Sequence, residues 1–101
     1  MANTAKALFR GAATTTTSTT LYTVPSSTTT IITNVIVTNT AATDGTFTLS
    51  LDDVAFASAV VVPAKGILTF DIEQVLATTK TIKGGANATS ISFHISGMEI
   101  A

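Results

Sequence analysis

The sequence contains no cysteine and no tryptophan, only one tyrosine and one histidine, and few charged residues. Without cysteine, the chain can form neither a disulfide scaffold nor a thiolate metal site. Five Lys and Arg residues stand against six Asp and Glu residues, so few phosphates could be neutralised. We therefore expect no nucleic-acid binding through a basic surface.

Long apolar runs are also missing. The longest, Val54–Val62, is interrupted by Ser58 and falls far short of the roughly 18 residues that suggest a membrane helix. The first residues, Met1–Ala13, include Lys6 and Arg10 but no continuous apolar stretch of signal-peptide length. The sequence predicts no membrane segment and synthesis in a cytoplasm without export.

The residues that are abundant favour β-structure. Hydrophobic residues make up 46% of the chain, charged residues only 11%, and threonine is the most frequent residue type. This composition is unlike disordered segments, which are charged and poor in apolar residues, and unlike coiled coils, which need many Glu, Lys, Leu and Arg residues. Because Thr, Val and Ile suit a pleated surface, the 101 residues predict one all-β domain.

The chain divides near residue 20. Residues 1–20 hold a short basic stretch and then a threonine tract with no apolar periodicity. We expect an extended Thr-rich N-terminal arm here, either a solvated tail or a segment that orders only against a neighbouring subunit. Residues 21–101 are expected to form the folded domain.

Strand signals and turn signals alternate from residue 19 onward. About seven or eight short strands with this spacing predict an antiparallel β-sandwich, either jelly-roll or immunoglobulin-like, and the pattern does not separate the two. Glu73–Ala77 fits a helical turn or a bent strand equally well. The expected strands are Thr19–Val24, Thr29–Asn39, Thr46–Leu51, Val54–Val62, Ile67–Ile72, Thr79–Lys83 and Thr89–Ile100. The expected turns contain Pro25, Asp44-Gly45, Asp52-Asp53, Pro63–Gly66 and Gly84-Gly85.

Alternation along each strand predicts the core. In Thr29–Asn39 both faces are apolar, with Ile32 and Ile36 on one and Ile31, Val35 and Val37 on the other. A strand with two apolar faces is often covered twice, and the second cover could be another subunit. The predicted core is Leu21, Ile32, Ile36, Phe47, Leu49, Leu51, Phe56, Leu68, Phe70, Ile72, Ile91, Phe93 and Ile95.

Candidates for catalysis are few. His94, the single histidine, lies between Ser92 and Ser96 in an alternating strand, and no G-x-S-x-G nucleophile motif accompanies it. We interpret it as a solvent-facing or interface residue and expect no catalytic residue and no enzymatic activity.

The acidic pairs give no metal site either. Asp52-Asp53 suits a hairpin turn. Asp71 and Glu73 would share a strand face, but calcium needs six to eight oxygen ligands. We expect no metal and no cofactor.

Self-association is expected instead. Few charges protect the strand edges, and low surface charge favours association. A closed, symmetric homo-oligomer is predicted, with a trimer as the first expectation. The candidate partner contacts are Lys6, Phe9, Arg10, Tyr22 and His94.

A series of short motifs runs along most of the chain. They are Y-T-V-P at Tyr22–Pro25, I-V-T-N within Val35–Asn39, T-F-x-L-x within Thr46–Leu51 and V-P-A-x-x-x-L-T at Val62–Thr69, and G-x-E-I ends the last strand. Through these motifs, about residues 20–100 of the chain resemble a family of small structural proteins of tailed bacteriophages.

This resemblance implies a non-enzymatic virion protein with a β-sandwich fold, assembled in the bacterial cytoplasm. We expect a capsid decoration or cement protein that contacts the major capsid protein, or else a small tail, neck, baseplate or fibre-adaptor subunit. A carbohydrate-binding module is the alternative of another class. Sugar sites usually offer aromatic platforms, and Tyr22 is the only candidate beyond phenylalanines expected in the core. A hydrolase that uses His94 is more remote.

Overall fold

The computed structural model describes residues 3–101, and within them nine strands and no helix are found. No segment of the described chain is therefore a helix that could cross a membrane. The strands are β1 (Asn3–Ala12), β2 (Thr20–Thr23), β3 (Thr29–Asn39), β4 (Gly45–Leu51), β5 (Val54–Val62), β6 (Ile67–Phe70), β7 (Gln74–Leu76), β8 (Thr81–Ala86) and β9 (Ile91–Ile100).

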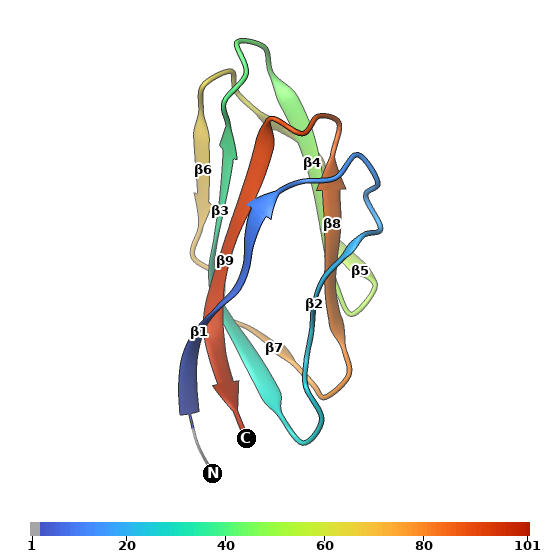
Figure 1. Cartoon of the computed structure of the whole chain (residues 1–101), viewed down its shortest axis with the longest axis vertical. Coiled ribbons are helices and arrows are strands. Elements are labelled where there is room, and N and C mark those ends of the chain that lie inside the picture. The colour runs from blue at the N-terminus through green and yellow to red at the C-terminus, as the bar shows by residue number, and fades with distance from the viewer. Residues whose placement is uncertain (1–2) are drawn as a thin grey trace.

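The strands form two antiparallel sheets packed as an elongated sandwich of 46 × 21 × 18 Å (Figure 1). One sheet has the order β1-β9-β3-β6, with β7 also pairing with β3, and the other has the order β2-β8-β4-β5. The predicted antiparallel sandwich is confirmed.

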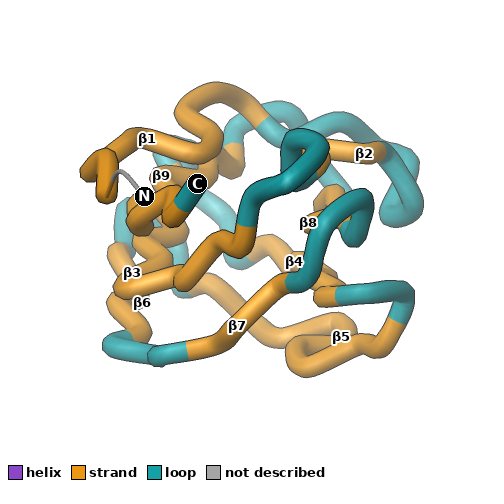
Figure 2. Tube along the Cα trace, turned by 90° about the horizontal axis from the view of Figure 1, so that it is seen from below, coloured by secondary structure: helices purple, strands orange, loops and turns teal. Residues whose placement is uncertain are grey.

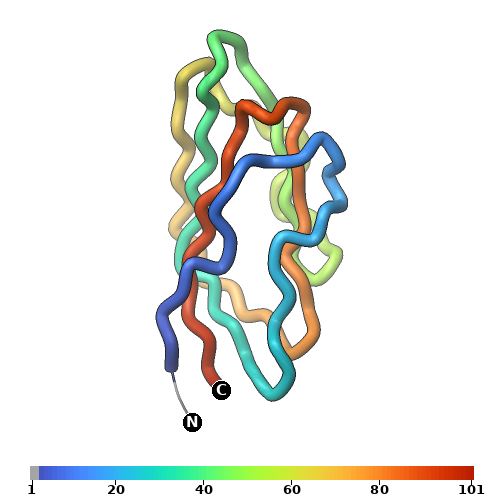
Figure 3. Tube along the Cα trace, viewed as in Figure 1, coloured from blue at the N-terminus to red at the C-terminus, as the bar shows by residue number. Residues whose placement is uncertain are grey.

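The connectivity is that of a jelly roll and not of an immunoglobulin-like domain. β1 pairs with β9, β2 with β8, β3 with β6 and β7, and β4 with β5. These are the pairings of one long ribbon that folds back on itself and rolls into two sheets. β1 begins and β9 ends at the same end of the sandwich, where Asn3 is paired with Ile100 (Figure 3).

The predicted N-terminal arm is part of the sandwich. β1 pairs with β9 along nearly its whole length, and Leu8 and Ala13 belong to the core. The threonine segment that follows is bonded to β8, since Ala86 N donates to the Thr14 carbonyl and Gly84 N to the Thr19 carbonyl, each at 2.9 Å. The boundary at residue 20 was wrong because the segment orders against its own chain. Met1 and Ala2 lie outside the described residues.

The glycine pair Gly84-Gly85 lies within a strand, which corrects a second prediction. Gly84-Gly85 was predicted to end a strand, but both residues lie inside β8 and are buried. A Cβ at Gly85 would collide with the Thr16 carbonyl, and one at Gly84 would lie 2.5 Å from the Thr48 carbonyl. These glycines allow neighbouring backbone to approach the strand closely.

Most of the predicted turns are observed. The two-residue turn between β4 and β5 has both aspartates at positive φ, 52° for Asp52 and 61° for Asp53, as a type I′ hairpin requires. The turn between β5 and β6 is closed by a hydrogen bond of 2.9 Å from Gly66 N to the Pro63 carbonyl. Glu73–Ala77, left open above, contains the short strand β7.

Two strands bury different side chains from those predicted. In β3 the register shifts between Ile32 and Asn34, which reverses the alternation: Val35 is buried, whereas Ile36 is only half-buried on the outer face. In β5 two register shifts place Ala57 inside and leave Phe56 41% exposed. β-Bulges re-aim the side chains that follow them, and alternation alone does not reveal them.

The other predicted core residues are either fully or partly buried, and further residues join the core that were not predicted. Buried as predicted are Ile32, Phe47, Leu49, Ile91, Phe93 and Ile95. Leu21, Leu51, Leu68, Phe70 and Ile72 are partly buried against that core. The buried hydrophobic residues that the predicted core did not include are Leu8, Ala13, Tyr22, Val24, Val35, Val37, Ala57, Val62, Leu76, Ile82 and Ala86.

Candidate functional site

The five predicted contact residues do not form one surface. Lys6 and Tyr22 meet at Glu99, near the end of the sandwich where β1 begins and β9 ends. Arg10 lies beside His94 on neighbouring strands. Phe9 packs partly buried against the core.

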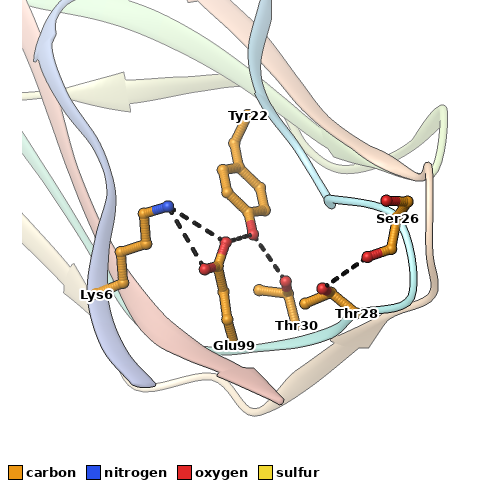
Figure 4. A network of polar contacts seen from close by, with 6 residues as sticks. All are labelled: Lys6, Tyr22, Ser26, Thr28, Thr30 and Glu99. Atoms are coloured by element: carbon orange, nitrogen blue, oxygen red, sulfur yellow. Dashed lines mark hydrogen bonds and ion pairs between the residues drawn. The ribbon is translucent and has the colours of Figure 1, made fainter. Parts of the chain in front are cut away.

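Tyr22 lies at the centre of a polar network between the two sheets (Figure 4). From β2, its hydroxyl donates to Glu99 Oε2 on β9 at 2.5 Å and lies 2.8 Å from the Thr30 hydroxyl on β3. Lys6 Nζ on β1 approaches the same carboxylate at 3.4 Å. The network therefore ties four strands together, because β2 belongs to one sheet and β1, β3 and β9 belong to the other.

The burial of this network changes the acidity of the phenol. Tyr22 is 8% exposed. Burial and the hydrogen bond to the Glu99 carboxylate together raise the pKa of Tyr22 to about 12, because both disfavour a second negative charge. As a ring for stacking sugars, Tyr22 was a wrong candidate, since its side chain is buried inside the sandwich.

His94 lies on the outer face of its sheet. Its cross-strand neighbours are Arg10 on β1 and Ile36 on β3. Neither can act as the acid that orients a catalytic histidine. Among residues 3–101, no group of three or more His, Asp or Glu side chains is placed to hold a metal ion, and no pocket is found.

The two aspartates of the β4–β5 turn form ion pairs with nearby lysines. Asp53 Oδ1 lies 2.8 Å from Lys83 Nζ, and Asp52 Oδ1 lies 3.5 Å from Lys80 Nζ. The hydrogen bond and charge of Lys83 hold the pKa of Asp53 below its usual range, with a smaller contribution from Lys80. Lys83 lies in β8, the strand next to β4, and Lys80 directly precedes β8, and the pairs give the turn no further evident chemistry.

One long side of the sandwich forms a surface that the sequence analysis did not single out. There β5 ends one sheet and β6 and β7 border the other, opposite β1 and β2 (Figure 2). None of these three strands contains a charged residue. We call this the β5–β7 side. Its large exposed apolar side chains are Val54, Phe56, Val61, Ile67 and Val75.

These five residues are all the large apolar side chains that are exposed within residues 3–101. Four of them are more than half exposed, from 53% for Val61 to 68% for Val54. Scattered apolar residues are normal on a protein surface, whereas apolar residues gathered on one side mark a contact surface. The uncharged run Val54–Val62 was the sequence signal, but pairing alone decides that it forms an outer strand.

The arrangement offers a docking surface rather than a site for chemistry. An uncharged side with exposed valine and isoleucine side chains can stabilise a contact by removing apolar area from water. No protein-family model and no curated protein sequence matches the chain.

Proposed function

We propose that the protein is a non-enzymatic structural subunit of a tailed-bacteriophage virion that works in many copies. The observation that carries the proposal is the β5–β7 side, whose three strands carry all the large exposed apolar side chains of residues 3–101. A surface of this kind suits permanent burial against other chains. The jelly-roll connectivity supports the proposal as an analogy, because many viral shell components use this architecture.

Within this class we propose a decoration or cement protein seated on the major capsid protein. Each copy would bury apolar and threonine-rich surface at a junction between shell subunits. The free energy of that burial would oppose the outward pressure of the packaged DNA, at about 25 cal/mol per Å² of apolar surface removed from water. A small tail, neck or baseplate subunit, or a fibre adaptor, would use the same surface in fewer copies.

The structure changes one part of this mechanism. An N-terminal strap over a neighbouring subunit would need residues that are free to leave the domain, but Asn3–Ala12 are a strand of the chain's own sheet. Docking in our proposal therefore depends on the rigid sandwich and not on an arm. A carbohydrate-binding role loses Tyr22 as its aromatic platform, because the side chain of Tyr22 is buried.

Quantitative mass spectrometry of purified virions tests the proposal. The number of copies of this chain is measured relative to the major capsid protein. Copies comparable with the capsid protein would support decoration of the head, and a small symmetric number would support the tail or neck alternative. Absence of the chain from purified virions would overturn the proposal.

A further inference from the structure

We propose that the β5–β7 side is covered by a second copy of this chain, related to the first by a two-fold axis perpendicular to the strands. The inference deepens the proposed function, on which it rests for the expectation that this side is covered. Three features of the chain support this inference. They are the charges on the outer strands of the sandwich, the exposed apolar side chains on β5, β6 and β7, and the charges at the two ends of the β5–β7 side.

Charged residues that discourage pairing with another chain are found on the outer strands of one side of the sandwich only. On the opposite side, β1 carries Lys6 and Arg10, and charged side chains on an outer strand are a common defence against pairing with another chain. β2 on that side is short and exposes threonines. The β5–β7 side has no charge on any strand. Charge on the outer strands therefore opposes association on one side of the sandwich and not on the other.

A partner that covers the β5–β7 side must itself be uncharged and apolar along the length of these three strands. A charged partner would lose hydration against Val61, Ile67 and Val75 without finding opposite charges on these strands. A second copy presents the same three uncharged strands, and an interface about a two-fold axis uses the same surface twice.

The charges at the two ends select the orientation of the second copy. Lys65 lies in the turn that joins β5 to β6. Asp71 and Glu73 lie at the other end of β6, where it leads into β7. A two-fold axis perpendicular to the strands brings Lys65 of one copy toward Asp71 and Glu73 of the other. A parallel arrangement, such as three copies around an axis along the strands, would place these acids against one another.

The other charges at the two ends of the β5–β7 side are consistent with the two-fold arrangement. Asp44 also lies near Lys65, with its Oδ1 accepting a hydrogen bond of 2.9 Å from Ala64 N, so the turn end is close to neutral. At the opposite end, Asp52 and Asp53 are each paired with a lysine. Asp71 and Glu73 have no ion pair within residues 3–101. They are the charges that a parallel arrangement would bring together.

The contact we infer is made by side chains and not by continuation of a sheet. β5 carries two register shifts against β4, and Ala59, at a φ of 50°, donates its N–H to the Thr48 hydroxyl at 3.1 Å. Bulges of this kind interrupt the regular backbone edge that an added strand would need.

Analytical ultracentrifugation of the full-length chain tests the inference. The wild-type protein is expected to sediment at twice its 10.3 kDa mass at high concentration. The triple variant Val61→Thr, Ile67→Thr and Val75→Thr keeps β-branched side chains and should sediment as a monomer with an unchanged circular dichroism spectrum. A dimer of unchanged affinity in this variant would overturn the placement of the interface.

A charge reversal tests the orientation. Lys65→Glu should weaken the dimer about tenfold, since two exposed ion pairs become repulsive by symmetry. Adding Glu73→Lys should restore most of the affinity. Arg10→Glu on β1 is the matched control, because it changes net charge equally and should leave the dimer intact. Equal weakening by Lys65→Glu and Arg10→Glu, or no recovery in the double variant, would overturn the two-fold arrangement.

The wild-type result also separates this inference from the proposed function. A monomer at every concentration, or a trimer, would overturn the two-fold dimer. If such a chain is nevertheless counted in purified virions, the structural role stands and only the occupant of the β5–β7 side is wrong. A dimer that is absent from virions would overturn the role and leave the dimer standing.

Discussion

Leu8 packs directly against Gly97, and this contact joins β1 to the core. A Cβ built on Gly97 would lie 2.9 Å from Leu8 Cδ1 and would collide with the Ile31 carbonyl. β1 shifts register on β9 around Leu8, and β3 shifts on the same part of β9 around Thr33. The two bulges thus lie on either side of Ser96, next to Gly97, and Leu8 fills the space that the missing side chain of Gly97 leaves.

We predict that Gly97→Ala destabilises the protein by about 1–3 kcal/mol, because the added methyl group overpacks a closed site. Leu8→Ala should cost about 2–5 kcal/mol through loss of buried surface. In the double variant the Ile31 carbonyl still obstructs the new Cβ, so the cost of Gly97→Ala should fall without vanishing. Urea unfolding of the four proteins measures the coupling. Strict additivity would contradict the contact.

The second prediction uses the single tyrosine of the chain. With a pKa of about 12 in the folded protein and 10.0 as the ordinary value, Tyr22 stays protonated after the unfolded chain begins to ionise. Its contribution to stability is therefore complete below pH 10 and is lost as the pH rises toward 12, by about 2–3 kcal/mol. Ultraviolet absorbance of the phenolate reports Tyr22 alone.

Two variants isolate the cause of this shift. Glu99→Gln removes the neighbouring negative charge and should bring the midpoint of the Tyr22 titration closer to 10. Tyr22→Phe should cost about 1–3 kcal/mol at neutral pH, since Thr30 and Glu99 lose a buried partner. Between pH 10 and 12 its stability should fall less than that of the wild type. Parallel losses in the two proteins would show that lysine titration, and not Tyr22, governs the alkaline range.

A matched pair of phenylalanine substitutions tests the bulges in β5. Phe93 is fully buried and packs edge-on against Phe47, with ring centroids 6.0 Å apart, whereas Phe56 is 41% exposed. Phe93→Ala should therefore cost about 3–5 kcal/mol. Phe56→Ala should cost less than about 1 kcal/mol, in the range of surface substitutions. Thermal unfolding measures both, and equal losses would mean that β5 has the regular register that alternation predicts.

Regular alternation made the fold class and two central strands predictable. Phe47 and Leu49 in β4, and Phe93 and Ile95 in β9, face the core as period-two reasoning requires. The errors arise where one extra residue reverses the alternation, as at Thr33, which no local composition marks.

Long-range pairing explains the other omissions. The first strand has five consecutive exposed residues before Leu8, so it shows no amphipathic pattern, and only pairing with β9 makes it a strand. The β5–β7 side depends on the same kind of information. Val54, Ile67 and Val75 were not in the predicted core, but only the order of the strands shows that their three strands border the same side of the sandwich.

The last prediction concerns the first strand itself. Removing residues 1–12 deletes Leu8 from the core and leaves β9 without its outer partner. The loss of Leu8 alone should cost about 2–5 kcal/mol, a large part of the roughly 5–15 kcal/mol that stabilises a typical domain. We therefore expect the shortened chain to unfold or to melt at a much lower temperature. The control is the full-length Lys6→Ala, Arg10→Ala double variant, which keeps the strand and removes its charges. A shortened chain that melts like this control would show that residues 3–12 are a dispensable arm, and the exposed edge of β9 would then be available to another chain.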